Sequence, residues 1–289
     1  MPLPLVWLDG RLLPLAEARI SPLDRGFLFG DAVYEVLPVY GGRAYRLDAH
    51  LERLERSLHE IRMEPVLDRS GWLAALGALV HGNGGGDLLL YVQVTRGVEP
   101  ERNQVPTPGT RATVLAFVMP MPFISAAMIE RGAAAVTAPD TRWARCDIKA
   151  TSLLANVLLR WQAADAAATE AILVRDGWLT EGSTSSVHVG QSGRVLTPPQ
   201  THLILPGTTR GALFDIADRE GIASERRPVS LAELRGADEI MVASAGRGIR
   251  AVTTLDGAPV GSGRPGPLFR RLHAGFLATR EEFSTELPA

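Results

Sequence analysis

The chain has 289 residues, 46% of them hydrophobic, which is enough for one large or two modest domains with their own cores. A formal net charge of -2 provides no bulk field that would favour nucleic acid or an acidic membrane surface. One cysteine excludes an internal disulfide framework, and no apolar run approaches the roughly 18 residues of a membrane span. Because the N-terminus lacks the pattern of a secretory signal, we expect a soluble, cytoplasmic protein.

The chain opens with a predicted hairpin that turns at Asp9-Gly10, a dipeptide suited to a type I′ turn. A glycine-punctuated loop over 21–31 then leads into a predicted strand over 32–40. Side chains alternate along a strand, so Tyr34 and Glu35 are expected on opposite faces.

Two helices and two strands are expected next. Apolar residues at helical spacing predict a first helix, with Asp48 as its cap and Arg53 on the flank of its apolar stripe. A second helix is predicted over 70–80, followed by strands over 88–95 and 112–119. The connection between these strands is long and polar, a kind of loop that is often functional.

Pro120-Met121-Pro122 is the best candidate for a linker, because two prolines stiffen an extended segment. We therefore predict a small N-terminal α/β domain over 1–119, a linker over 120–126 and a larger C-terminal domain over 127–289. The expected fold class is α/β, in the sense of a two-domain α+β protein.

The second part is expected to begin with a strand over 133–138. Apolar residues over 153–161 predict a helix, with Thr151 or Ser152 as its cap. Lys149 is therefore expected at a strand-to-helix junction rather than on a solvated helix face.

A second hairpin is predicted around Asp176-Gly177, and its returning strand ends at Glu181. Gly207 breaks the chain before a predicted helix that begins with Thr208-Thr209. A later strand ends at the small residues Ser244-Ala245-Gly246, and a final helix is expected from about 268.

Lys149 is the only lysine in the chain, and every other basic side chain among the 30 Lys and Arg residues is an arginine. A position that keeps lysine against this bias needs an amine that can lose its proton and act as a nucleophile. Such amines form Schiff bases with carbonyl compounds and with pyridoxal phosphate (PLP).

PLP requires an amine for its aldehyde, a carboxylate for its ring nitrogen and a site for its phosphate. Lys149 offers the amine, and Glu181, beside a turn of small residues, offers the carboxylate. The helix start at Thr208-Thr209, the turn at Ala245-Gly246 and the guanidinium of Arg53 are candidates for the phosphate. Each residue taken alone also suits an ordinary turn, cap or surface role.

Together these residues resemble the class IV (fold type IV) PLP-dependent aminotransferases, with the motifs in the order and spacing of that family. The stretches that carry the resemblance are Phe29–Glu35, His50–Leu54, Asp147–Lys149, Thr180–Ser183 and Ile204–Arg210. Within the class, Tyr91–Gly97 and Arg145–Lys149 are most similar to D-amino-acid aminotransferases. Leu154 stands where branched-chain aminotransferases have a tyrosine, five residues after the lysine.

The resemblance implies a homodimeric enzyme that transfers an amino group between a D-amino acid and a 2-oxo acid such as 2-oxoglutarate or pyruvate. It implies that Lys149 forms a Schiff base with PLP, that Glu181 pairs with the ring nitrogen, and that Arg53 and the Thr208-Thr209 turn hold the phosphate. It places Tyr34 on the substrate side.

The sequence departs from the familiar D-amino-acid aminotransferases where they hold the substrate carboxylate with an arginine and a histidine. Glu101 and Asn103 stand at those positions, and a glutamate repels a carboxylate. A relocated clamp is one interpretation, and its candidate arginines are Arg25, Arg102, Arg247 and Arg250. An (R)-selective amine transaminase is the alternative, and a lyase resembling aminodeoxychorismate lyase or a PLP-binding protein without turnover are further ones.

Two other patterns are set aside. The G-x-G-x-x-G match over 261–266 contains a proline and has too little chain after it for a dinucleotide-binding βαβ unit. The six histidines have no metal-ligand spacing, so no metal site is predicted, and Cys146 is interpreted as a packed small residue.

Overall fold

The structure is a computed structural model that describes residues 1–288. Contacts between residues divide the chain into two compact units. The first comprises Met1–Met121, Ile148–Ser152 and the C-terminal stretch from Arg280, and the second comprises Pro122–Asp147 and Leu153–Thr279. The limits predicted for the two domains, 1–119 and 127–289, stay a prediction about independently folding parts.

A seven-stranded sheet organises the first unit, with every neighbouring pair antiparallel and the order β16-β4-β3-β5-β6-β1-β2. Its strands are β1 Leu5–Leu8, β2 Arg11–Pro14, β3 Ala32–Tyr40, β4 Arg43–Tyr45, β5 Leu88–Thr95, β6 Thr113–Pro120 and β16 Ser284–Glu286. The strands predicted over 32–40 and 88–95 are confirmed with the same limits. β3 and β5 pair from residue 32 to residue 39 of β3, which makes them the centre of this sheet.

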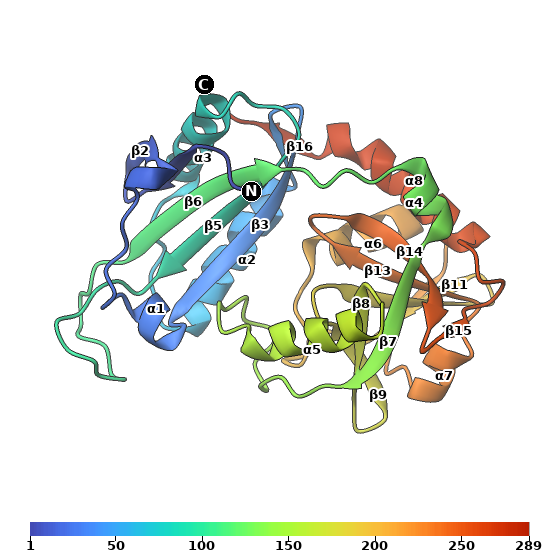
Figure 1. The fold of residues 1–289 in the computed structure, drawn as a ribbon. Helices are drawn as coiled ribbons and strands as arrows, with labels where there is room; N and C mark the ends of the chain where they lie inside the picture. The colour runs from blue at the N-terminus through green and yellow to red at the C-terminus, as the bar shows by residue number, and fades with distance from the viewer. Residues whose placement is uncertain (289) are drawn as a thin grey trace. The chain divides into compact units, whose positions relative to one another are not determined.

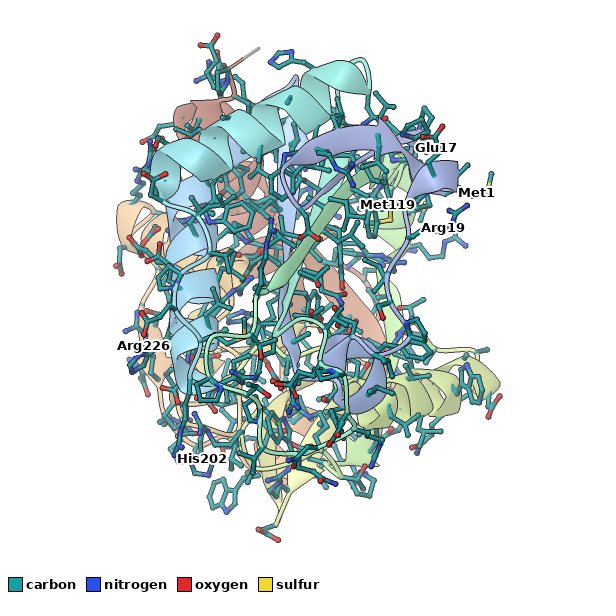
Figure 2. The ribbon with its side chains drawn as sticks, turned by 90° about the vertical axis from the view of Figure 1, so that its left-hand side faces the viewer. Met1, Glu17, Arg19, Met119, His202 and Arg226 are labelled. Carbon is teal, nitrogen blue, oxygen red and sulfur yellow. The ribbon has the colours of Figure 1, made fainter. Side chains whose placement is uncertain are left out.

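Helices cover one side of this sheet, where α2 and α3 lie together (Figure 1). The helical segments are a 3-10 turn Leu15–Glu17, α1 Arg25–Phe29, α2 Leu47–Glu60 and α3 Arg69–Gly82. Leu54 of α2 and Trp72 of α3 pack into one buried cluster with Leu37 and Leu90 of the central strands. The segment after β2, in contrast, carries the exposed side chains of Glu17 and Arg19 (Figure 2).

The first hairpin is confirmed, since Asp9 and Gly10 have the positive φ angles, 48° and 89°, of a type I′ turn. Two local predictions are wrong. The stretch predicted as a loop contains α1, because the Asp24 carboxylate caps it by accepting the Gly26 N–H at 2.8 Å. Asp48 lies in the first turn of α2 rather than at its cap, which is Arg46 in a left-handed conformation.

The second unit is built on a nine-stranded mixed sheet with the order β12-β11-β10-β13-β14-β7-β8-β9, and β15 pairs with β14. Its strands are β7 Ala133–Pro139, β8 Glu170–Arg175, β9 Trp178–Gly182, β10 Ser186–Gln191, β11 Arg194–Thr197, β12 Ser224–Arg226, β13 Glu239–Ser244, β14 Gly248–Leu255 and β15 Ala258–Pro259. Its helices are α4 Ala126–Arg131, α5 Leu154–Asp165, α6 Thr208–Arg219, α7 Leu231–Arg235 and α8 Pro267–Glu282, whose last residues count with the first unit.

α5 packs on β7 and β8 through Leu159 and Ala163, which are buried together with Leu173. The helix was predicted, but neither Thr151 nor Ser152 caps it, because Leu153 occupies the cap position. The hydroxyls of these two residues donate instead to the Gly30 carbonyl, at 3.4 and 3.3 Å, and so hold the segment before the helix.

Candidate active site

Lys149 lies between β7 and α5, as predicted, in a segment that continues the sheet of the first unit. The Tyr34 N–H donates to the Lys149 carbonyl at 2.9 Å, and Val33 and Ala150 form an antiparallel bridge. Since β5 occupies one edge of β3 from end to end, the segment takes the other edge, where β4 reaches only the last two residues. The backbone of Lys149 is therefore fixed by β-sheet hydrogen bonds although its neighbours in sequence form a loop.

The Lys149 amine lies over the ring of Tyr34, with Nζ 4.1 Å from the ring centroid. Tyr34 in turn stacks on Tyr91 at 5.6 Å, and Tyr91 stacks on Phe117 at 4.7 Å. The face of β3 that carries Tyr34 is thus lined by aromatic rings from two neighbouring strands. The Lys149 amine therefore makes a cation–π contact with this face rather than an ion pair.

On the opposite face of β3, the Glu35 carboxylate holds Arg53 of α2. Arg53 donates from Nε to Oε1 at 2.7 Å and from Nη2 to Oε2 at 2.8 Å, and Nδ1 of His50 lies 2.7 Å from Oε2. All three side chains are buried. Burial by itself raises the pKa of Glu35, but the Arg53 charge and these hydrogen bonds bring it down to about 2. The guanidinium of Arg53 therefore has one fixed orientation.

Glu181 is the last residue but one of β9, one residue before the end of the strand, and is buried in the second unit. Nη1 of Arg142 donates to its Oε1 in a short ion pair, and the Leu205 N–H donates to its Oε2 at 3.1 Å. Burial raises the pKa of Glu181 to about 7, against the opposing charge and hydrogen bond of Arg142. Sequence reasoning missed Arg142, and the only signal was its place in the segment just before Lys149.

The turn after Glu181 is organised by Glu170, a buried carboxylate at the start of β8. Hydroxyls of Ser183, Thr184 and Ser185 all donate to it, the last two at 2.9 and 2.7 Å. Three hydroxyls on one carboxylate fix the conformation of this turn.

α6 begins at Thr208, and its cap residue Gly207 has no side chain that could cap the helix. Thr209 is buried, and Arg210 ties this turn down by donating to Gln200 at 2.8 Å and to the Pro198 carbonyl at 2.7 Å. A helix start without a capping side chain leaves N–H groups and the positive end of the helix dipole for an anion.

The turn Ser244–Gly246 connects β13 to β14, and its Ala245 and Gly246 are partly exposed. Arg247 follows at the surface, and the half-buried Arg250 donates weakly to the Gly132 carbonyl at 3.4 Å. Burial and the nearby charge of Arg247 lower the pKa of Arg250. Within residues 1–288, neither arginine forms an ion pair with a carboxylate, so two cations lie close together without a counter-charge.

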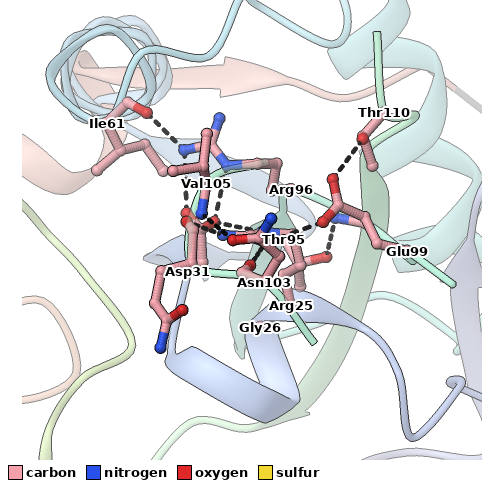
Figure 3. A network of polar contacts seen from close by, with 12 residues as sticks. Arg25, Gly26, Asp31, Ile61, Thr95, Arg96, Glu99, Asn103, Val105 and Thr110 are labelled. Atoms are coloured by element: carbon pink, nitrogen blue, oxygen red, sulfur yellow. Dashed lines mark hydrogen bonds and ion pairs between the residues drawn. The ribbon is translucent and has the colours of Figure 1, made fainter. Parts of the chain in front are cut away.

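Arg25 is committed to the loop that follows β5 (Figure 3). It donates to Asp31 at 2.9 Å, to Glu99 at 3.0 Å, and to the carbonyls of Asn103 and Gln104 at 2.5 and 2.9 Å. The interpretation of Arg25 as a substrate clamp is therefore wrong, because its guanidinium anchors the loop.

Arg102 is exposed on the same loop, and its guanidinium lies 4.7 Å from the ring centroid of Phe29. Glu101 and Asn103 beside it are also exposed. The loop thus presents one arginine whose charge faces an aromatic ring rather than a carboxylate.

Comparison with known proteins identifies the family. A family model described as "Amino-transferase class IV" matches residues 32–255. D-alanine aminotransferase of Bacillus licheniformis is 39% identical over 267 residues, which cover 92% of this chain and 94% of that protein. The chain belongs to the class IV aminotransferases.

Solved structures of class IV aminotransferases confirm the predicted two-part, fold type IV architecture. Branched-chain amino acid aminotransferase of Escherichia coli superimposes with a TM-score of 0.91 at 22% identity, over 99% of this chain and 100% of that one. A hypothetical aminotransferase of Mycobacterium tuberculosis, solved in a PLP-bound form, has a TM-score of 0.81 at 28% identity over 96% and 100% of the two chains. As a class IV aminotransferase, the chain is a PLP-dependent enzyme.

The donor set fits PLP. A single amine, a buried carboxylate held by an arginine, and a helix start without a capping side chain are the three groups that the aldehyde, the ring nitrogen and the phosphate require. Cys146, in contrast, is buried and its thiol donates to the Trp143 carbonyl at 3.1 Å, while burial raises its pKa to about 11. Packing, rather than nucleophilic chemistry, accounts for it.

Within residues 1–288 there is neither a cluster of metal-ligating side chains nor a helix that could span a membrane. No three His, Cys, Asp or Glu side chains are grouped so that they could hold a metal ion. No helix in this part of the chain is long and apolar enough to cross a membrane. His202, one of the six histidines, is exposed (Figure 2).

Proposed function

We propose that this class IV aminotransferase transfers an amino group between a D-amino acid of the D-alanine or D-glutamate type and a 2-oxo acid. The observation that carries the proposal is the 39% identity to a D-alanine aminotransferase across nearly the whole of both chains. Leu154, at the position of the tyrosine expected for branched-chain enzymes, supports the same choice.

We propose that seven residues hold the cofactor. Lys149 binds PLP as a Schiff base, and Glu181 pairs with the ring nitrogen. Arg53, Thr208, Thr209 and the turn at Ala245-Gly246 hold the phosphate. Bound PLP supplies an electron sink that stabilises negative charge at the α-carbon of an amino acid.

The side chains of this enzyme then have separate tasks. The Lys149 amine would take the proton from the substrate α-carbon and deliver it to C4′ of the cofactor, acting first as general base and then as general acid. Its backbone is fixed by β3, so only the four-carbon side chain has to move. Tyr34, below the amine, bounds the space on the substrate side.

For the substrate carboxylate we propose Arg247, assisted by Arg250. These two cations lack a carboxylate partner within the described residues, and an anion between them would relieve their mutual repulsion. Arg102 is the second candidate, since its guanidinium rests on Phe29 without an ion pair.

The cofactor assignment is tested with purified protein and PLP. We expect an absorbance band near the visible edge that is absent in Lys149→Ala. Because Lys149 is the only lysine, borohydride should then fix the cofactor to one peptide. A wild-type protein without this band would contradict the assignment.

The substrate assignment is tested by half-reaction rates with D-alanine, D-glutamate and (R)-1-phenylethylamine. Glu101 and Asn103 favour the alternative of an (R)-selective amine transaminase, for which the plain amine reacts fastest. With the relocated clamp, Arg247→Ala slows both D-amino acids by about ten- to a hundredfold and leaves the amine unchanged. Pyruvate release from aminodeoxychorismate without an amino acceptor would instead indicate a lyase.

We also propose a homodimer. α5 carries an apolar stripe that faces away from the core of its own unit, with Leu154 72%, Leu158 54% and Trp161 66% exposed. Exposed apolar patches of this kind mark protein–protein contacts. Light scattering should give twice the mass of the 31.1 kDa chain, and Leu158→Glu together with Trp161→Glu should produce monomers.

A cytoplasmic location is proposed from the 2-oxo acid substrates, and cell fractionation tests it.

A further inference from the structure

Arg142 is a buried cation that lies between two carboxylates, and nothing in the proposed function gives it a role. Its Nε and Nη2 donate to the two oxygens of Asp140, each at 2.9 Å, while Nη1 donates to Glu181. The guanidinium is planar, so the paired bonds to Asp140 fix the direction in which Nη1 points. Asp140 therefore orients the one donor that reaches Glu181.

Asp140 is itself held in place. Its side chain is fully buried, the Thr180 hydroxyl donates to Oδ2 at 2.8 Å, and Nη2 of Arg175 lies 3.3 Å from Oδ1. The acceptor that orients Arg142 thus has two further partners. Arg142, 9% exposed, has little freedom to turn away from Glu181.

Glu181 needs such a partner to remain an anion. It is buried, and a buried carboxylate without an opposite charge takes up a proton because its ionised form is poorly solvated. Its pKa is already raised to about 7 by burial with Arg142 in place. Without the Arg142 charge, the same carboxyl group would be neutral at neutral pH and would have no charge to offer a protonated ring nitrogen.

We propose that Arg142, oriented by Asp140, is a positioning residue that holds Glu181 as an anion, and that it thereby selects a cofactor whose ring carries a protonated nitrogen. The inference rests on the proposed pairing of Glu181 with that nitrogen. Charges then alternate along the series from Asp140 through Arg142 and Glu181 to the ring. The protein's own cation sets the electronic state of the cofactor without touching it.

A purely structural role makes a different prediction. Nη2 of Arg142 also donates to the Leu203 carbonyl at 3.3 Å, so the side chain tethers the segment before α6. If tethering were its whole role, loss of Arg142 would weaken binding of every cofactor analogue equally. If it acts through Glu181, only cofactors with a ring nitrogen would lose affinity.

The test compares binding of PLP and of its analogue with carbon in place of the ring nitrogen to the cofactor-free protein, by fluorescence titration. Arg142→Met should weaken PLP binding by about ten- to a hundredfold and change binding of the carbon analogue by less than about threefold. Arg142→Lys, which keeps the charge, should recover part of the preference. The matched control is Arg145→Met, since Arg145 lies in the same segment and pairs with Asp147 at 3.1 Å. This variant should keep the full preference for PLP over the carbon analogue.

Asp140→Asn provides a second variant should Arg142→Met fold poorly, which thermal unfolding would reveal. It retains the cation but loosens its orientation, so its preference for PLP should lie between those of the wild type and Arg142→Met. Equal loss for both cofactors in either variant, or an unchanged preference, would overturn the inference. A wild-type protein that binds both cofactors equally would instead refute the proposed role of Glu181, and one that binds neither would refute the cofactor assignment.

Discussion

Glu35 and Glu181 are both buried glutamates bonded to a buried arginine, yet their pKa values shift in opposite directions from the ordinary value. Against the raising effect of burial, Arg53 and His50 bring the pKa of Glu35 to about 2, whereas burial raises the pKa of Glu181 to about 7. Burial and an arginine partner therefore do not by themselves decide the state of a carboxylate.

The number of donors and the neighbour of the arginine account for the difference. Glu35 receives two N–H groups from Arg53, and His50 lies at 2.7 Å from the same carboxylate. Glu181 receives one N–H from an arginine whose other bonds go to Asp140, and the charge of Asp140 acts on Glu181 as well. Hydrogen-bond partners surround the Glu35 carboxylate, whereas the Glu181 carboxylate can still interact with a further cation.

The largest effect should come from Glu35→Gln. This change leaves the Arg53 guanidinium buried without an opposite charge, and breaking a buried ion pair in this way typically costs about 3–5 kcal/mol. Urea unfolding of the cofactor-free protein would measure it. Glu181→Gln is the matched comparison and should cost much less, because Arg142 keeps its bonds to Asp140. Equal costs would remove the distinction between the two sites.

The pH dependence of stability should separate the two sites further. Glu181 has a raised pKa in the folded protein, so between its ordinary value of 4.5 and about 7 the folded state binds more protons than the unfolded state. Wild-type stability should therefore fall relative to Glu181→Gln as pH rises through this window, by up to about 1.4 kcal/mol per pH unit.

Taking the difference between wild type and Glu181→Gln cancels the other titrating groups. Glu35, with a lowered pKa, contributes stability above pH 4.5 that is lost as pH falls towards 2, and it does so in both proteins. Chemical unfolding at several pH values between 4 and 8 provides the data. A difference that is constant across that range would show that the Glu181 carboxyl group is not perturbed.

Glu181→Gln, expected to have the smaller effect on stability, should have a large effect on cofactor affinity. Glu181→Gln removes the charge proposed for the ring nitrogen, so PLP affinity should fall by about ten- to a hundredfold, the range for a charge-assisted hydrogen bond. Equilibrium titration of the cofactor-free variant measures it, with the carbon analogue as control. A variant that binds PLP as tightly as wild type would place the ring nitrogen elsewhere.

The smallest change in stability is expected at His188, a buried polar side chain. His188 is fully buried, and among the described residues neither ring nitrogen has a hydrogen-bond partner. Burial, with the nearby Arg210 charge, lowers its pKa to about 3. His188→Leu should stabilise the protein by about 1 kcal/mol, since an unsatisfied polar group is removed from the core. Thermal unfolding tests this, with the exposed His202→Leu as control; a clear loss of stability would contradict it.

Local sequence patterns were sufficient for most of the fold. Alternation and helical spacing predicted the strand that carries Tyr34 and the helix that carries Arg53, because both patterns report on nearby residues. They could not place Lys149 beside Tyr34 or Ala150 beside Val33, since these contacts join residues more than a hundred positions apart. Only the three-dimensional pairing fixes the backbone of Lys149.

Charged residues were the main failure of sequence reasoning. Arg142 and Asp140 resemble solvated surface charges in the sequence, and their partner Glu181 lies 39 residues further on. Arg25 was one of four candidate arginines for the clamp, but Glu99 and two carbonyls hold its guanidinium in the interior. Apolar spacing predicted the helix α5, but periodicity has no means of telling a core-facing stripe from one that faces a partner.

The discontinuity of the first unit limits how this protein can be dissected. No single cut releases it, because the edge of β3 is completed by Ile148–Ser152 and the sheet by β16 near the C-terminus. A fragment ending at Met121 would leave one edge of β3 unpaired except at its last two residues, which pair with β4, and would lack the only lysine. Fragment complementation, in which residues 1–121 are supplied separately from the remainder, should therefore restore the strand pairing and the reactive lysine in a single event. In such a split enzyme, reassembly of the fold and recovery of cofactor chemistry could not be uncoupled.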